Sequence, residues 1–265
     1  MRRTIVYFLL LTSFCLTYSQ DHFRGQSNPP PRQNKWINIP VGNRLVRTFA
    51  VFPTVSYKTP AILLIHDNQG LTNWVKSFAD QLAASGFIVL APDLLSGLGP
   101  SRGGTSSFQS SDATRSAVSG MDIDQVVIDL SAISHYSTRL PGANGKTAAV
   151  GFGWGGTQAF HLAASNAAIT ASFVFYGTGP KESVAYQQIQ IPVYGFYGSQ
   201  DGRTNATVSL SQQYMRELGK IFEPVFYMGA GPNFMRRADS PGAPSAYLQA
   251  KEAALQRLVE ILKDL

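Results

Sequence analysis

Apolar residues along this chain fall into short continuous runs and into helical stripes. Residues 61–65 and 87–91 are unbroken apolar runs, typical of strands that are buried on both faces. Between them Trp74, Phe78 and Leu82 recur every four residues, which predicts an amphipathic helix. The pattern therefore indicates a strand, a helix and a second strand in succession.

The same alternation continues to the end of the chain. Further strands are predicted at about 46–52, 147–152, 171–176, 192–197 and 223–228, with helices at about 121–140, 155–165, 207–219 and 246–264. Only residues 96–120 lack periodicity; they contain eight Ser and five Gly, so we expect a long loop that is either functional or disordered. Strands that alternate with helices predict one α/β domain over 36–265, with a mostly parallel central sheet and helices on both faces.

The first 19 residues follow another pattern. Arg2 and Arg3 precede an apolar stretch, and Thr17 and Ser19 stand at positions −3 and −1 of a cleavage site before Gln20. This arrangement predicts a Sec-type signal peptide over 1–19, and hence a secreted or periplasmic protein.

The apolar stretch of this leader is too short to predict a membrane span. Lipid attachment at Cys15 is not expected, because the bulky Phe14 precedes it where a lipoprotein signal requires a small residue. Residues 20–35 include three consecutive prolines and predict a flexible or polyproline lead-in to the domain.

Composition narrows the function further. The 265 residues are 44% hydrophobic and 14% charged, which excludes a wholly disordered chain, and a single Cys excludes a disulfide scaffold or a Cys-rich zinc site. Removal of residues 1–19 leaves 20 basic and 16 acidic residues, a formal net charge of +4. Because no long basic run occurs, we expect no nucleic-acid partner.

Chemistry is expected at the carboxyl ends of the strands, where ligands gather in sheets of this kind. One such end reads GFGWGG at 151–156, a strand that enters a glycine-rich sharp turn and then a helix. This is the form of a nucleophile elbow. The other polar strand ends are IHDNQG at 65–70, YGSQDG at 197–202 and GAGPNF at 229–234.

From about residue 45 to the C-terminus the chain resembles the dienelactone hydrolase family. The segments that carry the resemblance are LLIHDNQG, VLAPDLLSG, GGT at 103–105, NGK at 144–146, GFGWGG, FYG at 175–177, YGSQDGRTNAT and GAGPNFMR. The resemblance implies an α/β-hydrolase fold and hydrolysis of lactone or ester bonds by a Cys-His-Asp triad, without a cofactor.

Carried over to this sequence, the family pattern places the triad acid at Asp201, the nucleophile at Gly153 and the triad histidine at Pro232. The acid that restrains the nucleophile corresponds to Asp67, and a pocket arginine corresponds to Arg236. Glycine cannot attack a carbonyl and proline cannot transfer a proton, so the family mechanism lacks two of its three groups.

The oxyanion hole implied by the resemblance needs only backbone N–H groups, here those of Trp154 and of the turn at Asn68. The Trp154 side chain either lines a pocket or packs in the core. Arg102, together with the pocket arginine, would favour an anionic group on the ligand.

His66 lies nearest to the expected chemistry, yet as a replacement base it would need a nucleophile to serve. His66, Asp67 and Asp201 could also converge on a metal. We favour instead polar residues inherited from a hydrolase pocket, with no metal.

Three hypotheses follow. In the first, the chain is a secreted, catalytically impaired member of the family that binds a small organic acid, ester or lactone. In the second, it is an active ester or lactone hydrolase with a rearranged site, in which Asp67, Asp201 or His66 activates water. In the third, it is a non-enzymatic extracellular interaction protein that uses residues 96–120 or the proline-rich lead-in.

Overall fold

The structure is a computed structural model that describes residues 32–165 and 167–265. A single eight-stranded sheet has the order β1-β2-β4-β3-β5-β6-β7-β8. Its strands are β1 Gln33–Val41, β2 Arg44–Phe52, β3 Thr59–Ile65, β4 Ile88–Pro92, β5 Ala143–Phe152, β6 Ala171–Phe175, β7 Val193–Gly198 and β8 Phe222–Tyr227. The pairings from β4 through β3 to β8 are parallel, and β1 and β2 add an antiparallel edge. The predicted α/β class with a mostly parallel sheet is thus confirmed.

Successive residues of the central strands enter two different cores. On β3, Ile62 and Leu64 pack with the core on one face of the sheet, whereas Leu63 and Ile65 pack with the core on the other. Because both faces are covered, all seven residues of β3 are buried. This explains the continuous apolar run in the sequence.

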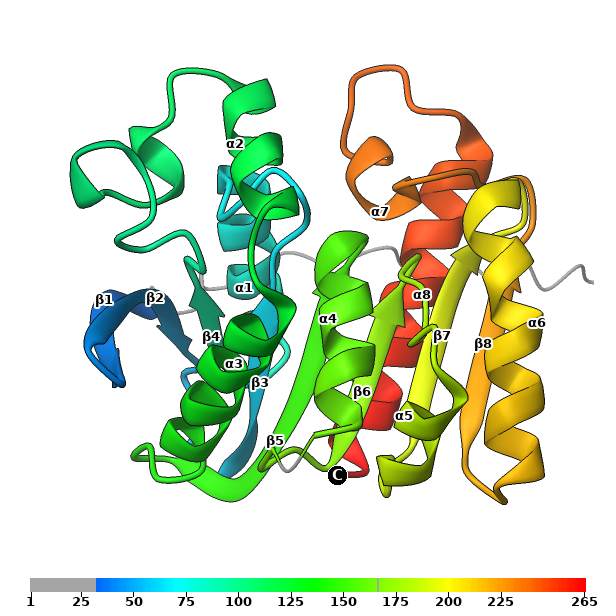
Figure 1. The fold of residues 1–265 in the computed structure, drawn as a ribbon, viewed down its shortest axis with the longest axis horizontal. Helices are drawn as coiled ribbons and strands as arrows, with labels where there is room; N and C mark the ends of the chain where they lie inside the picture. The colour runs from blue at the N-terminus through cyan, green and yellow to red at the C-terminus, as the bar shows by residue number, and fades with distance from the viewer. Residues whose placement is uncertain (1–31, 166) are drawn as a thin grey trace, which may run out of the picture. The chain divides into compact units, whose positions relative to one another are not determined.

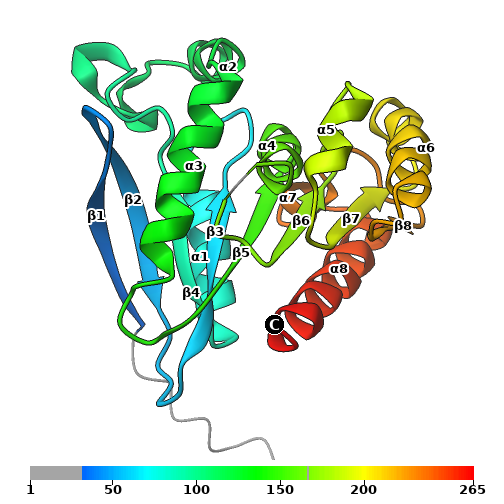
Figure 2. The ribbon, with the colours of Figure 1, turned by 60° about the horizontal axis from the view of Figure 1, so that its bottom comes forward.

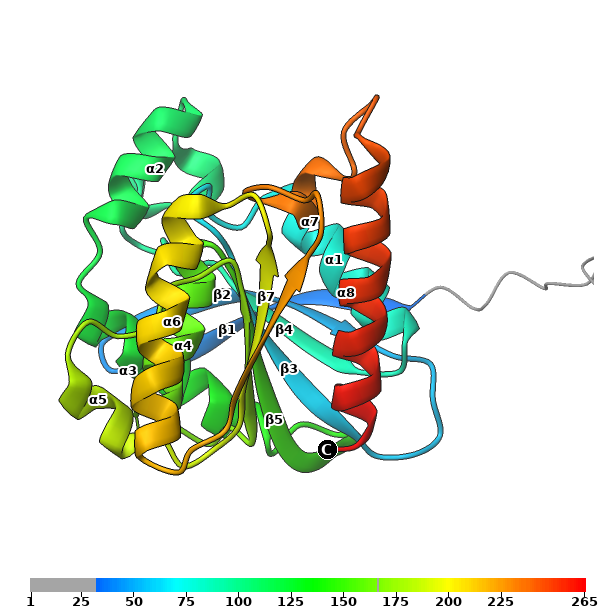
Figure 3. The same cartoon turned by 90° about the vertical axis from the view of Figure 1, so that its right-hand side faces the viewer.

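Helices form a layer on each face of the sheet (Figures 1 and 3). α3, α4, α5 and α6 cover one face, and α1, α7 and α8 cover the other. Their bounds are α1 Asn73–Ala84, α2 Ser111–Ser119, α3 Ile123–Ser137, α4 Trp154–Ala163, α5 Ser183–Gln188, α6 Gly202–Glu217, α7 Phe234–Arg237 and α8 Ser245–Lys263. Two short 3₁₀ turns, η1 Pro100–Arg102 and η2 Thr105–Ser107, precede α2.

The loops at the carboxyl ends of the strands carry α2 and α7 (Figure 1). Below α2, α3 runs along the sheet and packs against β1, β3 and β5 (Figure 2). The strand ends at 65–70, 151–156, 197–202 and 229–234 therefore lie at one edge of the sheet, beneath these loops.

Besides the short helices α5 and α7 and the two 3₁₀ turns, which were not predicted, two longer elements differ from the sequence-based expectation. β1 adds an unpredicted edge strand next to the predicted strand at 46–52, and it begins at Gln33, inside the predicted lead-in. Its first four residues are exposed, so they carry no apolar pattern.

Residues 111–119 form a helix and not a loop: Ser110 caps it by accepting a hydrogen bond from the Ala113 N–H. α2 buries only Thr114 and Val118, so its apolar face is too small to stand out in the sequence.

Residues 32–265 form one compact unit. The predicted signal peptide at 1–19 and most of the lead-in at 20–35 lie outside the described residues, so both remain predictions. Among the helices of residues 32–165 and 167–265, none is long and apolar enough to cross a membrane.

Candidate active site

The turn between β5 and α4 has the geometry of an elbow. Its central residue, Gly153, has φ 54° and ψ −114°, a backbone conformation that side chains disfavour. The Gly153 N–H donates to the Phe175 carbonyl at 2.9 Å, and its carbonyl accepts from the Thr157 N–H at 3.0 Å. These bonds hold the turn between β6 and the first turn of α4.

Glycines let α4 approach the strand ends closely. A Cβ on Gly155 would lie 2.2 Å from the His66 carbonyl oxygen, and one on Gly151 would lie 2.0 Å from the Gly155 carbonyl oxygen. Gly153 differs, because a Cβ there would meet only ordinary contacts, 3.8 Å from Asp67 Cβ and 3.9 Å from both Asn233 Oδ1 and Tyr176 Cδ2. Space for a side chain is therefore present at Gly153 and absent at the nearby glycines Gly151 and Gly155.

This space opens into a cavity of about 430 Å³, which we call the elbow cavity. Its walls come from the carboxyl ends of β3, β5, β6 and β7, from the helices α2, α4 and α6, and from the turn before α7. Of the residues singled out from the sequence, six line it: Asp67, Asn68, Gly153, Trp154, Asp201 and Pro232. His66, Arg236 and Arg102 do not.

Asp67 is held by two partners inside the protein. One carboxylate oxygen accepts the Gln69 N–H at 2.8 Å, and the other lies 2.6 Å from Arg236 Nη2. The guanidinium of Arg236 also lies over the Trp74 ring, 5.1 Å from its centroid. Arg236 thus neutralises an acid beside the elbow and is not itself part of the cavity wall.

His66 is completely buried and both ring nitrogens are engaged. Nδ1 lies 2.8 Å from the Asp67 carbonyl oxygen, which can only accept, and Nε2 accepts the Leu94 N–H at 3.4 Å. These partners fix the neutral tautomer with the proton on Nδ1. Trp154 stacks on the ring, with centroids 5.7 Å apart.

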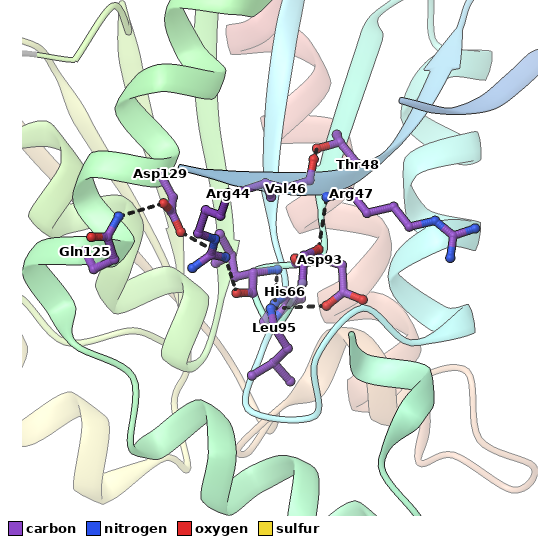
Figure 4. Close-up of polar contacts among 11 residues, drawn as sticks. Arg44, Val46, Arg47, Thr48, His66, Asp93, Leu95, Gln125 and Asp129 are labelled. Atoms are coloured by element: carbon purple, nitrogen blue, oxygen red, sulfur yellow. Dashed lines mark hydrogen bonds and ion pairs between the residues drawn. The ribbon is translucent and has the colours of Figure 1, made fainter. Parts of the chain in front are cut away.

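The same contacts connect His66 to a structural network (Figure 4). Arg44 Nη2 donates to the Leu94 carbonyl at 2.9 Å and pairs with the buried carboxylate of Asp129 at 3.2 Å. Burial raises the pKa of Asp129, while a hydrogen bond from Gln125 and the charge of Arg44 oppose the rise. This network fastens the β1–β2 edge to α3, so His66 has a role in architecture.

Asp201 is buried and caps α6. Its carboxylate accepts the Thr204 N–H at 3.3 Å, as expected for an acid at a helix N-cap. Pro232 is exposed at the cavity wall, and Asn233 beside it adopts a left-handed conformation with φ 56° before α7 begins. Asn233, rather than Pro232, places a polar atom near the elbow.

Arg102 belongs to a different cavity, beside Asp93 and Thr105 in the segment that follows β4. The sequence analysis grouped it with Arg236 as a cation that would favour an anionic ligand at the elbow. The structure instead turns residues 99–107 away into two 3₁₀ turns.

Several residues that line the elbow cavity were missed by the sequence analysis. Tyr176 lies at the end of β6 with φ 43°, and burial, then the charge of Asp67, raise its pKa well above the ordinary value for tyrosine. It therefore remains a neutral hydroxyl. Arg203 brings a positive charge, and five hydroxyl residues complete the polar wall: Ser119, Thr157, Thr178, Thr204 and Thr207. The motif at 197–207 contains Arg203, Thr204 and Thr207, but nothing in the spacing of the motif shows that these side chains face the cavity.

Within residues 32–165 and 167–265, no group of three or more His, Cys, Asp or Glu side chains could hold a metal ion. His66 does not line the cavity, and Asp67 and Asp201 each have partners in the protein. The described residues thus offer polar and charged groups for an organic ligand and no metal-binding cluster.

The sequence model of the Dienelactone hydrolase family matches residues 46–265. The chain belongs to this family. The expected resemblance is thereby confirmed over nearly the whole sheet. Among relatives of the family, carboxymethylenebutenolidase 1 of Cupriavidus pinatubonensis is 27% identical over 211 residues, which cover 77% of this chain and 87% of the relative.

Solved structures of dienelactone hydrolase type share the fold. A dienelactone hydrolase-like promiscuous phosphotriesterase from metagenomic libraries superimposes with a TM-score of 0.75 at 21% identity, over 88% of this chain and 98% of its own. Dienelactone hydrolase from Anabaena variabilis gives a TM-score of 0.62 at 19% identity, over 84% and 95% of the two chains. At these identities the likeness establishes the α/β-hydrolase fold.

Proposed function

We propose that this protein is a catalytically impaired dienelactone hydrolase-family member that binds a small organic acid, ester or lactone in the elbow cavity. The observation that carries the proposal is Gly153. It has the strained elbow conformation and open space where a side chain would stand, but no side chain. A covalent acyl intermediate requires a nucleophilic atom at that point, and none is present.

The proposal is also supported by the lack of a general base. None of the three histidines that the structure describes lines the cavity, and Pro232, at the position of the family histidine, carries no titratable group. Among the described residues that do line it, Asp67 is paired with Arg236 and Asp201 caps α6. The Tyr176 hydroxyl is held neutral by burial, so it can donate a hydrogen bond but cannot act as a base at ordinary pH.

The cavity suits a small polar ligand. Its volume of about 430 Å³ falls in the range of about 300–1,000 Å³ that is usual for small-molecule sites. At the elbow, the Trp154 N–H is at the first position of α4, where it has no acceptor within the helix, and the family resemblance implies that it donates to a bound carbonyl or carboxylate oxygen. Arg203 favours an anionic ligand, and the hydroxyl residues of the wall provide further hydrogen bonds.

We further propose that the protein is secreted or exported to a periplasm. The support is the sequence pattern of residues 1–19 alone, with its two arginines, apolar stretch and small residues before Gln20. N-terminal sequencing of the exported protein tests this proposal, and a mature N-terminus at Met1 would contradict it.

The deciding experiment compares ester and lactone hydrolysis by the native protein and by the Gly153→Cys/Pro232→His double variant. We expect no turnover above background for the native protein. The double variant should exceed it by about 10² or more, since a positioned general base alone typically contributes that much. The two single variants are the matched controls, because each supplies only half of the pair and should stay near the native level.

Native turnover at about 1 s⁻¹ or faster, an ordinary enzyme rate, would overturn the proposal. The rearranged-site hypothesis would then take its place, since the carboxylates of Asp67 and Asp201 both line the cavity. An Asp201→Asn variant that keeps its circular dichroism spectrum but loses this turnover would support that mechanism. Unchanged turnover in Asp201→Asn would exclude a role for Asp201 in it.

A further inference from the structure

A second cavity, which we call the loop cavity, lies between the outer strands and the segment that follows β4. It has a volume of about 450 Å³ and does not share a lining residue with the elbow cavity. Trp36 comes from β1, Arg47 from β2, Lys76 from α1, and Asp93 and Arg102 from the segment after β4. Four separate parts of the chain thus converge on it.

Positive charge dominates this cavity. Arg47, Lys76 and Arg102 line it, and within the described part of the chain none of them lies within ion-pair distance of an acid. Asp93, the one acid in the wall, is occupied: its carboxylate accepts the Thr105 N–H at 2.8 Å, the Thr105 hydroxyl at 2.7 Å and the Leu95 N–H at 3.2 Å. The formal charge of the site is +2, without a counterion from the described residues.

Arg102 is fixed on a closed and strained loop. Both Ser101, with φ 52°, and Arg102, with φ 57°, adopt the left-handed conformation that side chains disfavour. The Gly97 and Gly99 N–H groups both donate to the Gly103 carbonyl, at 2.9 and 3.1 Å, which closes the loop. Backbone strain of this kind persists where the surrounding structure imposes it, and it gathers at binding sites.

The loop is also packed too tightly to rearrange freely. A Cβ on Gly104 would lie 2.2 Å from Asp93 Oδ2, so only glycine allows the backbone to sit against this carboxylate. Thr105 in turn accepts the Leu71 N–H at 3.0 Å, which fastens the loop to the turn after β3. The cationic side chains therefore project from a preformed frame, which lowers the ordering cost of binding.

An aromatic and apolar wall stands beside the charges. Trp36 is 41% exposed; its ring is held by the Arg47 guanidinium, 4.2 Å from the centroid, and by the edge of Phe49 at 5.4 Å. Leu45, also in the wall, is 57% exposed. A ligand with both an anionic head and a flat or apolar body would match this surface.

We propose that the loop cavity binds a phosphate monoester. Its phosphoryl group, with a charge of about −1.5 to −2 near pH 7, complements the +2 of Arg47, Lys76, Arg102 and Asp93. The guanidinium and ammonium groups donate to the phosphoryl oxygens, and the organic body of the ester packs on Trp36 and Leu45. This site does not depend on the function proposed for the elbow cavity.

The test is calorimetric titration of the purified full-length protein with phenyl phosphate, inorganic phosphate, sulfate and benzoate at low ionic strength. We expect one phenyl phosphate per chain, bound about tenfold more tightly than benzoate, which has a single charge. Inorganic phosphate should bind more weakly than the ester because it lacks the organic body. Tighter binding of inorganic phosphate would overturn the assignment to a monoester, as would equal binding of benzoate that Lys76→Gln weakens to the same degree.

Variants locate the site. Lys76→Gln and Arg102→Gln should each weaken phenyl phosphate binding by about tenfold, as expected for a lost charged hydrogen bond. Lys76 lies on α1, outside the strained loop, so its variant gives a result even if Arg102→Gln disturbs the fold. Trp36→Ala should weaken binding of the ester and leave binding of inorganic phosphate unchanged.

Two controls distinguish this cavity from the rest of the surface. Arg115→Gln removes a cation from α2 that is paired with Asp112, and Arg203→Gln removes the cation of the elbow cavity. Both should leave phenyl phosphate binding unchanged. Loss of binding in Arg203→Gln with full binding in Lys76→Gln would place the ligand in the elbow cavity and overturn the proposal, as would the lack of saturable binding.

Discussion

The elbow cavity and the loop cavity use their charged residues in opposite ways. In the elbow cavity the motif residues are satisfied within the protein, since Asp67 pairs with Arg236 and Asp201 caps α6. In the loop cavity, whose three cations lie outside the family motifs, the acid is saturated by neutral donors, and the described residues provide no acidic partner for Arg102 and the other cations. The comparison teaches that a family motif can retain a charged residue, such as Asp67 or Asp201, whose charge is already used by a partner inside the protein.

The largest effect that would test this contrast is on stability. Asp67→Asn keeps an oxygen for the Gln69 N–H but removes the charge opposite Arg236, whose side chain is only 20% exposed. We expect the free energy of unfolding in urea to fall by about 2 kcal/mol, below the range for fully buried pairs because some solvent reaches this one.

Asp80→Asn is the matched control, because Asp80 pairs with Arg32 at a more exposed site, where its side chain is 45% exposed. Such surface pairs contribute about 1 kcal/mol or less. Equal losses in the two variants would show that the Asp67–Arg236 pair is an ordinary surface contact, and the contrast between the cavities would be lost.

A smaller effect is expected in the loop cavity. Arg102→Gly relieves left-handed strain of about 1–2 kcal/mol but costs about 0.5–1 kcal/mol of backbone entropy, so the free energy of unfolding should change little or rise slightly. Phenyl phosphate binding should nevertheless fall. Ser101→Gly relieves similar strain and keeps the cation, so it should retain binding. A clear loss of stability in Arg102→Gly would mean that Arg102 has a structural partner.

The smallest effect concerns pH, because no histidine of the described residues lines either cavity. Burial lowers the pKa of His161 below its ordinary value of 6.5, against a weaker opposing effect of Asp124. The unfolded chain then binds the proton more readily, so the stability contributed by neutral His161 is full above pH 6.5 and is lost as pH falls toward the folded-state pKa.

Urea unfolding between pH 8 and 5 should show this decrease, at most about 1.4 kcal/mol for each unit of the shift. The slope attributable to His161 should vanish in His161→Gln. A slope that persists in this variant would assign the effect to another group.

Much of the fold was predictable because it depends on local patterns. The unbroken run at 61–65 requires a strand covered on both faces, and the spacing of Trp74, Phe78 and Leu82 requires a helix with one buried face. β1 and α2 were not predictable in the same way. Their exposed residues leave little apolar periodicity, and their positions are fixed by pairing with β2 and by the Ser110 cap.

The sequence by itself determined the α/β class, the family, and an elbow with Gly153 at its centre, because motifs of adjacent residues encode turns and strand ends. Only the tertiary structure decided that Asp67 is neutralised by Arg236, that both nitrogens of His66 are engaged, and that Arg102 belongs to another cavity. The physical reason is that an ion pair or hydrogen bond depends on groups brought together from distant segments. Spacing along the chain shows which groups are present, and the packed sheet decides which of them meet.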